Sequence, residues 1–408
     1  QTLRIDSGSL TNANGKLRAL GAQANSRFKI GSQFNNDSGL VEVGNDQFSL
    51  ESASLTNQLG IVRHLGTGGF DLSLADSGAA GGSFITNSQL NLDLANWTNT
   101  SLIQAQKIGL KVGTFTQTAS GKLVSVEGVE ATGANWINDG SLETQGDLKL
   151  VLSGAYRGNG ALKSQGKMSF AAASADLGTD AQLRSGGNAD FTLGSQMVNQ
   201  GSLTATGDLL LTVVSLTNRG TLGAGKALSV ETPTLVNEGG LIFSGADMAL
   251  RTNSLTNNKG DIYSLGRLDV SGIDAKPASL IENISGTIES AHGMQLLANR
   301  LINRKEKFSY IAAMTSGHID LVATDNCKGD HCEAYYSVNE VFGTKVVEDS
   351  ARANLISGAE LNFIGDSFDN QFSTVSAGGA IKLDSKTLKN IGAGGGEQRN
   401  SSYMIYTK

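Results

Sequence analysis

Two cysteines and a histidine lie close together in the last quarter of the chain and are the residues best placed for chemistry. Cys327 and Cys332 are the only cysteines among 408 residues, and His331 lies between them. A structural zinc site needs four ligands, and no second group of Cys or His is present, so we expect no metal. A close pair in a chain otherwise free of cysteine predicts one small disulfide loop in a secreted protein. The alternative is two free thiols in an intracellular chain.

Acidic and aromatic residues surround this pair. Asp325, Asp330 and Glu333 lack the spacing of a calcium-binding EF-hand loop, so we interpret them as a solvated acidic segment.

Three aromatic residues follow, and together with His331 they are our candidate receptor contacts: Tyr335, Tyr336 and Phe342. Aromatic side chains in such a segment anchor a partner, or they pack the segment onto the rest of the chain. The sequence leaves both interpretations open.

No group of residues predicts catalysis. An enzyme that cleaves polysaccharides needs clustered acidic and basic groups on one face. Charged residues are scattered singly here, and the four histidines, His64, His292, His318 and His331, are far apart in sequence. We therefore predict no catalytic residue and no cofactor.

A recurring asparagine, with an apolar residue two positions before it, indicates the elements that position these residues. Successive steps from Asn199 to Asn303 are 19, 19, 20, 26 and 20 residues, and the step from Asn370 to Asn390 is again 20. We expect these asparagines to form a hydrogen-bonded ladder or to occupy left-handed turn positions, a structural role in either case. The set is Asn199, Asn218, Asn237, Asn257, Asn283, Asn303, Asn370 and Asn390.

A fixed period near 20 residues indicates stacked coils that share one core. Apolar residues recur after Asn199 at Leu203, Leu209, Leu211 and Leu216, and the Leu209/Leu211 alternation is typical of strands. Helical spacing is absent. A leucine-rich repeat would place its last leucine three residues before the asparagine, whereas Leu211 lies seven residues before Asn218. We predict an all-β, right-handed parallel β-helix with coils of about 20 residues.

The coil pattern divides the chain into three parts. We expect a β-helix over residues 1–322, an extruded loop over 323–354, and resumed coils with a C-terminal end over 355–408. Ile319 and Leu321 have the alternation of one more coil strand. A six-residue insertion near 271–277 and a turn-rich loop around Gly78 are expected at the surface. Roughly 18 to 19 coils spaced by about 4.8 Å give a rod on the order of 90 Å long.

Composition excludes several classes of function. The net charge is −6, with 32 Lys and Arg against 38 Asp and Glu, so the basic surface of a nucleic-acid-binding protein is missing. No apolar run reaches membrane-spanning length. We therefore expect neither a nucleic-acid partner nor a membrane span.

The coil sequence resembles the haemagglutinin repeats of filamentous haemagglutinin and of the contact-dependent growth inhibition exoproteins. Its pattern is complete in Asn199, Gly201, Leu203, Ala205, Gly207, Leu209 and Leu211, and it recurs in at least eight coils. The secretion domain of those families carries asparagine–proline motifs, whereas the only prolines here are Pro233 and Pro277. The resemblance therefore implies an interior piece of a large two-partner secretion exoprotein.

This resemblance carries expectations about function. It implies secretion through an outer-membrane transporter to the outer surface of a Gram-negative bacterium, as a monomeric segment of a filament. The break after Asn303, with its Cys pair, resembles the region of the inhibition exoproteins near the receptor-binding segment. We expect a non-catalytic stalk and receptor-contact segment that binds a surface receptor of target bacteria. A host-cell adhesin of the filamentous haemagglutinin kind is the alternative, and a polysaccharide-processing β-helix enzyme is the least favoured hypothesis.

Overall fold

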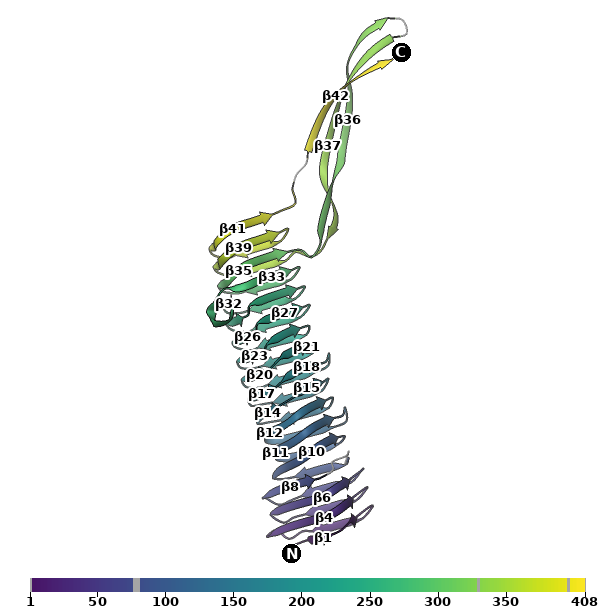
Figure 1. The fold of residues 1–408 in the computed structure, drawn as a ribbon, viewed down its shortest axis with the longest axis vertical. Coiled ribbons are helices and arrows are strands. Elements are labelled where there is room, and N and C mark those ends of the chain that lie inside the picture. The colour runs from purple at the N-terminus through teal and green to yellow at the C-terminus, as the bar shows by residue number, and fades with distance from the viewer. Residues whose placement is uncertain (1, 76–80, 329–330, 395–396, 408) are drawn as a thin grey trace.

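A computed structural model describes residues 2–75, 81–328, 331–394 and 397–407. Its body is a parallel β-solenoid of about 19 turns, and a three-stranded antiparallel sheet projects from one end (Figure 1). The predicted parallel β-helix is confirmed. The loop expected around Gly78 lies outside the described residues.

The N-terminal coils contain several long strands that continue from one face of the solenoid onto the next. Strand β4, for example, pairs with β1 and then with β2. These strands are β1 (Arg4–Ser7), β2 (Leu10–Thr11), β3 (Lys16–Ala19), β4 (Asn25–Asn35), β5 (Leu40–Val43), β6 (Gln47–Thr56), β7 (Ile61–His64), β8 (Gly69–Leu74), β9 (Ser83–Thr86), β10 (Gln89–Asn99), β11 (Leu102–Gln117) and β12 (Lys122–Asn138).

From residue 141 the strands are shorter and form three parallel faces. The first face stacks β15 (Ala155–Gly158), β18 (Ser174–Leu177), β21 (Gln196–Asn199), β24 (Ser215–Asn218), β27 (Thr234–Glu238), β30 (Ser254–Asn258) and β33 (Ala278–Ile284). The second stacks β13 (Ser141–Thr144), β16 (Ala161–Ser164), β19 (Gln182–Ser185), β22 (Ser202–Ala205), β25 (Thr221–Ala224), β28 (Leu241–Ser244), β31 (Asp261–Ser264), β34 (Thr287–Ser290), β38 (Asn354–Ser357) and β40 (Thr374–Ala377). The third stacks β14 (Asp147–Leu152), β17 (Met168–Ala172), β20 (Ala189–Leu193), β23 (Leu209–Thr212), β26 (Leu228–Glu231), β29 (Met248–Arg251) and β32 (Leu268–Ser271).

Three longer strands, β35 (Met294–Arg304), β39 (Leu361–Gln371) and β41 (Ile381–Ile391), continue the third face into the first. The 26-residue step before Asn283 contains the short 3-10 helix η1 (Ile273–Ala275), where the sequence predicted an insertion.

Alternate side chains of each strand point into one continuous apolar core. Leu203, Leu211 and Leu216 are all fully buried, as their spacing predicted. The spacing that places Leu203 in the core, four residues after Asn199, predicts the same position for Leu241, four residues after Asn237. This prediction was wrong, because Leu241 is 37% exposed and Ile242 is fully buried instead. The turn after Asn237 is one residue longer than the turn after Asn218, and a shift of one residue turns every side chain of a strand to the opposite face.

The recurring asparagines lie at the ends of first-face strands and point inward. Each side-chain amide nitrogen donates to the side-chain oxygen of the asparagine one coil further on, at 2.7–2.9 Å, without a break from Asn199 to Asn390. None of the eight has a positive φ, so the left-handed alternative does not apply to them. A buried amide is costly when it lacks a partner, so the ladder lets a polar group recur inside the core.

Two shorter ladders precede this one. The first joins Asn12, Asn36 and Asn57. The second begins with Asn99, includes Asn138, and contains two residues that the asparagine pattern did not reveal. The side-chain amide of Gln117 accepts from Asn99 and donates to Asn138, and Asn138 donates to the hydroxyl oxygen of Tyr156 at 3.1 Å. Leu177 then occupies the ladder position next to Asn199 and leaves the side-chain oxygen of Asn199 without a partner.

The solenoid continues across the irregular segment that follows Asn303. Asn303 donates to Asn370 at 2.8 Å although the two are 67 residues apart, whereas Asn283 and Asn303 are separated by 20. The difference, 67 − 20 = 47 residues, is the length of chain inserted between two neighbouring coils. Because Asn283 also donates to the carbonyl of Asn354, the coils on either side of the insertion are in register.

The inserted chain forms most of the projecting sheet, a name we use for β36 (Phe308–Lys328), β37 (His331–Asp349) and β42 (Glu397–Thr407). The antiparallel pairing of β36 with β37 begins at Phe308, whereas the sequence placed the start of an extruded loop at residue 323. Ile319 and Leu321 therefore belong to β36 and not to a coil, because strand alternation does not specify which sheet a strand joins. The chain after β41 leaves the solenoid and adds β42 to this sheet.

Candidate receptor-contact site

The base of the projecting sheet is attached to the solenoid by aromatic and ionic contacts. The Phe308 ring packs against Phe372, in the turn after β39, with 4.2 Å between the ring centroids. Lys305 forms an ion pair with Asp349, and its ammonium lies 4.8 Å from the centroid of the Phe308 ring. These contacts join both ends of the β36–β37 hairpin to the last coils and support a fixed base.

The register of the three strands separates apolar from polar side chains. Paired residues of an antiparallel sheet share a face, and successive residues alternate between faces. Near the tip, one side, which we call the apolar face, carries Ile319, Leu321, Ala334, Tyr336, Val338, Tyr403 and Ile405. The opposite side, the polar face, carries Ser316, His318, Asp320, Ser337, Asn339, Gln398, Asn400 and Ser402, together with Tyr335, Val341 and Met404.

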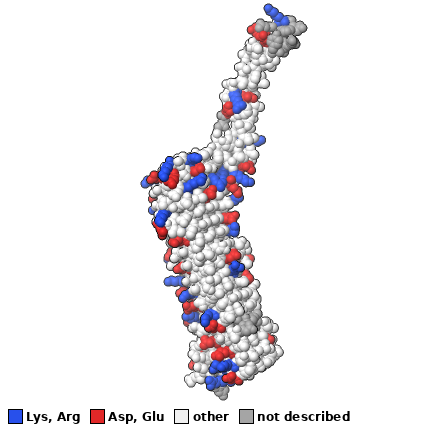
Figure 2. Space-filling view, viewed as in Figure 1, with Lys and Arg blue, Asp and Glu red and all other residues white. Residues whose placement is uncertain are grey.

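The apolar face is open to solvent. Ile319 is 65% exposed, Leu321 and Tyr403 are 56% exposed, and Ile405 is 51% exposed. Figure 2 shows few charged side chains along the middle of the projecting sheet, in contrast to the charged region around its base. Soluble proteins seldom leave a contiguous apolar patch uncovered, and such patches mark interaction sites. An exposed apolar face of this kind is typical of a docking surface.

The polar face has the character of a solvated surface. His318 and Asp320 lie two residues apart on β36, with 2.7 Å between the His318 Nε2 and the Asp320 carboxylate, and both side chains are more than half exposed. Asn339 pairs with His318 on one side and with Asn400 on the other. These groups hydrogen-bond readily to water, so this face does not need a partner.

The candidate contact residues do not all lie on one face. Tyr336 and Phe342 lie on the side of the apolar face, whereas Tyr335 lies on the opposite side. The Tyr335 hydroxyl donates to the Glu333 carboxylate at 3.2 Å, and this hydrogen bond raises the pKa of Tyr335. The structure therefore places two of the predicted aromatics on the same face, six residues apart on β37, and directs the third to the opposite face.

Phe342 marks the end of the apolar face nearest the base. The Arg399 guanidinium lies 5.0 Å from the centroid of its ring and bonds to Glu397 at 2.9 Å. The hydrogen bond from Arg399 lowers the pKa of Glu397. This charged pair limits the apolar surface on the side toward the solenoid.

The tip of the sheet is closed by a disulfide between Cys327 and Cys332, as the close spacing of the two cysteines predicted. His331 is the first residue of β37 and pairs with Lys328 through its backbone, and its side chain lies outside the described part of the structure, as does Asp330. The disulfide joins the ends of β36 and β37 next to the apolar face.

Sequence reasoning missed the residues that contribute most to the apolar face. Ile319 and Leu321 alternate with polar residues, which is the signal of a half-buried strand, whereas Tyr403 and Ile405 are separated by Met404 and lack this signal. The alternation places Ile319 and Leu321 on a strand. It does not reveal that residues about 80 positions apart form one surface, because the pairing passes through β37.

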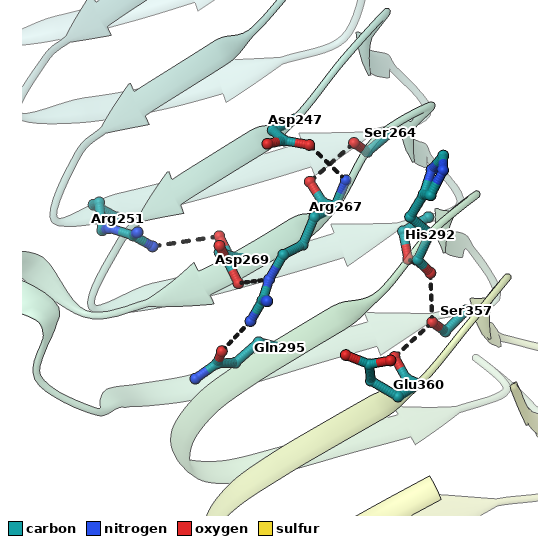
Figure 3. Close-up of polar contacts among 10 residues, drawn as sticks. Asp247, Arg251, Ser264, Arg267, Asp269, His292, Gln295, Ser357 and Glu360 are labelled. Atoms are coloured by element: carbon teal, nitrogen blue, oxygen red, sulfur yellow. Dashed lines mark hydrogen bonds and ion pairs between the residues drawn. The ribbon is translucent and has the colours of Figure 1, made fainter. Parts of the chain in front are cut away.

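A charged cluster on the third solenoid face is the arrangement most similar to a catalytic site (Figure 3). Arg267 donates to Asp269 at 2.9 Å and to Gln295, and its backbone N–H donates to Asp247 at 2.8 Å. Arg251 donates to the backbone carbonyl of Asp269 at 3.4 Å. The charged groups satisfy one another between successive coils, so the cluster stabilises the stack.

The described part of the chain has no group of three or more His, Cys, Asp or Glu side chains placed to hold a metal ion. Within the same residues, no helix has the length and apolar character required to cross a membrane.

Comparison with known proteins agrees with the architecture. A family model of the haemagglutinin repeat matches residues 212–273, 272–309 and 315–394. Among curated proteins, the chain is similar to the deoxyribonuclease CdiA of Dickeya dadantii (strain 3937), with 25% identity over 323 residues that cover 68% of this chain and 9% of that protein. It is also similar to the toxin CdiA of Escherichia coli, with 29% identity over 328 residues, 66% of this chain and 10% of that protein. A third relative is the tRNA nuclease CdiA of Escherichia coli (strain NC101), with 29% identity over 310 residues, 66% of this chain and 9% of that protein. No solved structure matches the chain significantly.

The fold and the repeat matches define a β-solenoid region built from haemagglutinin repeats. The repeat matches and the CdiA relatives support a repeat region of a two-partner secretion exoprotein of the filamentous haemagglutinin and contact-dependent growth inhibition type, as the resemblance predicted. The repeats and the relatives indicate a secreted exoprotein on the surface of a Gram-negative bacterium. The chain spans about a tenth of the length of these relatives.

Proposed function

We propose that this region is a non-catalytic stalk whose projecting sheet contacts a surface receptor on target bacteria, within an exoprotein of contact-dependent growth inhibition. The observation that carries the proposal is the uncovered apolar face at the far end of a rigid solenoid. A three-stranded sheet normally needs a layer packed on its apolar side. The receptor supplies that layer.

The solenoid gives the sheet its reach. About 19 coils separated by about 4.8 Å extend on the order of 90 Å. The amide ladder joins consecutive coils from Asn199 to Asn390, and the contacts of Phe308 and Lys305 fix the base of the sheet. A contact surface on such a support is held away from the producing cell.

The partners follow from the same proposal. An outer-membrane transporter exports the parent exoprotein, and a cell-surface receptor binds the apolar face. The region acts as a monomeric segment of the filament. Catalysis is not part of its role, because Asp247, Asp269 and Arg267 already bond to one another or to neighbouring coils.

The test uses the parent exoprotein on producing cells and measures their binding to target bacteria and to host epithelial cells. The apolar-face variant combines Ile319→Ser, Leu321→Ser and Tyr403→Ser. A matched control on the polar face combines Asp320→Ser, Asn339→Ser and Asn400→Ser.

We expect the apolar-face variant to lose at least about tenfold in binding to target bacteria, because burial of each of these side chains contributes roughly 1.5–3 kcal/mol. The control should bind like the unmodified protein. Equal binding by both variants contradicts the proposal. Binding to host cells alone, lost in the apolar-face variant, assigns the same surface to a host adhesin instead.

A further inference from the structure

The wall of the solenoid contains an open groove that is separate from the projecting sheet. This wall groove crosses β25, β28, β31 and β34 on the second face and has a volume of about 700 Å³. Its character comes from Leu241, Phe243, Asp261, Tyr263, Leu265 and Glu289. Its size lies in the range of cavities that hold small molecules or single side chains.

In-register stacking gathers these residues from three coils. Phe243 pairs with Tyr263, which pairs with Glu289, so the three outward side chains are neighbours along the solenoid axis. Asp261 lies two residues before Tyr263 on β31 and therefore points to the same side. One carboxylate thus lies beside Tyr263 on the same strand, and the other lies one coil further on, on the side of Tyr263 away from Phe243.

A glycine determines how the aromatic pair is presented. Gly223 is in register with Phe243, and a Cβ at this position would clash with the Phe243 ring. The ring therefore occupies the space above Gly223. Leu241 and Leu265, which are 37% and 49% exposed, extend the apolar surface on either side of the rings.

The carboxylates of the wall groove have no counter-charge. No lysine or arginine lines the groove, and among the described residues neither Asp261 nor Glu289 has a side-chain ion pair or hydrogen bond. Among the cations on nearby turns, Arg219 pairs with Glu238 at 2.8 Å and Lys259 pairs with Glu306 at 2.7 Å. Lys226 follows Gly225 and lies outside the residues that line the groove. Charge complementarity therefore calls for a cation.

We propose that the wall groove binds an arginine side chain of a partner protein. A guanidinium stacks on aromatic faces, presents five donors in one plane, and pairs bidentately with carboxylates. Phe243 and Tyr263 provide the faces, and Asp261 and Glu289 provide the acceptors on either side of Tyr263. The apolar stem of the arginine lies along Leu241 and Leu265. An ammonium ion with a full hydration shell fits this apolar surface less well.

The experiment titrates the 408-residue chain with acetyl-arginine-amide and with its neutral isostere, acetyl-citrulline-amide, and follows binding by NMR or calorimetry. We expect saturable binding of the arginine probe at low salt and at least about tenfold weaker binding of the citrulline probe, because charge-assisted hydrogen bonds are about twice as strong as neutral ones. Higher salt should weaken binding of the arginine probe.

Variants localise the site. The double variant Asp261→Asn/Glu289→Gln should lose at least about tenfold in affinity for the arginine probe. The matched control Asp176→Asn/Glu231→Gln removes the same charge from exposed positions outside the groove and should keep the affinity. Thermal unfolding of both variants checks that the coils remain folded. Equal affinity for both probes, or equal effects of the two double variants, overturns the proposal.

Discussion

Removing one member of the asparagine ladder should destabilise the coils around it. Asn237 donates to Asn257 at 2.8 Å and to the Gly240 carbonyl at 2.9 Å, and it accepts from Asn218 at 2.8 Å. Asn237→Ala removes these three bonds, each with a net contribution of about 1 kcal/mol, and a longer bond of 3.3 Å to the Asp261 carbonyl. It also leaves the buried side-chain oxygen of Asn257 without a donor, which costs about 1–3 kcal/mol more. We expect a local loss of about 4–6 kcal/mol.

Hydrogen exchange is the suitable assay, because stacked coils open locally and a single melting temperature does not report one site. A loss of 4 kcal/mol lowers protection of the amides in β24, β27 and β30 by about 1,000-fold. The matched control is Asn258→Ala, since the buried side-chain oxygen of Asn258 has no partner and lies outside the ladder. We expect less than about a threefold change for the control. Similar protection in both variants would refute the role of the ladder.

Three further predictions concern other parts of the chain. Burial lowers the pKa of His64, whose ring bonds to the Asn45 carbonyl and to Thr86, so the neutral form is favoured in the fold. Because an unfolded histidine titrates near 6.5, the first coils should be fully stable above that pH and lose stability as the pH falls below it; hydrogen exchange in β7 against pH tests this, and a pH-independent result contradicts it. Reducing the Cys327–Cys332 disulfide should weaken binding to target cells while the solenoid unfolds as before, as measured by cell binding and calorimetry together; unchanged binding would exclude a role for the closed tip. Phe372→Ala removes an aromatic contact that contributes roughly 0.5–1.5 kcal/mol beyond area burial, so spin-label distances between sheet and solenoid should broaden; distributions as narrow as in the unmodified protein would show that the base does not depend on this ring.

The repeating part of the fold could be predicted from the sequence because each coil carries the same information. The apolar alternation and the asparagine of one coil recur in the next, so the period alone determines which residues stack. The prediction for Leu241 was wrong because one additional residue in the turn moves each side chain of the following strand to the opposite face of the sheet. Gln117 and Tyr156 escaped notice because they replace asparagine in the ladder with other hydrogen-bonding groups.

The candidate site could be predicted only in part, for a different reason. The Cys327–Cys332 pair and the aromatics are local features and were visible. Tyr403 pairs with Tyr336, and Ile405 pairs with Ala334. This long-range antiparallel pairing is not predicted by any repeat period in the sequence. The same limitation hid the wall groove, because Phe243, Tyr263 and Glu289 become neighbours only once the register of three coils is known.

Site-specific photo-crosslinking on intact target bacteria tests most directly whether the apolar face makes the receptor contact. A photoreactive amino acid replaces Leu321 on the apolar face in one version of the parent exoprotein and Asn400 on the polar face in another. The account predicts a covalent adduct with one cell-surface protein from position 321 and none from position 400. Adducts of equal yield from both positions, or from position 400 alone, would contradict it.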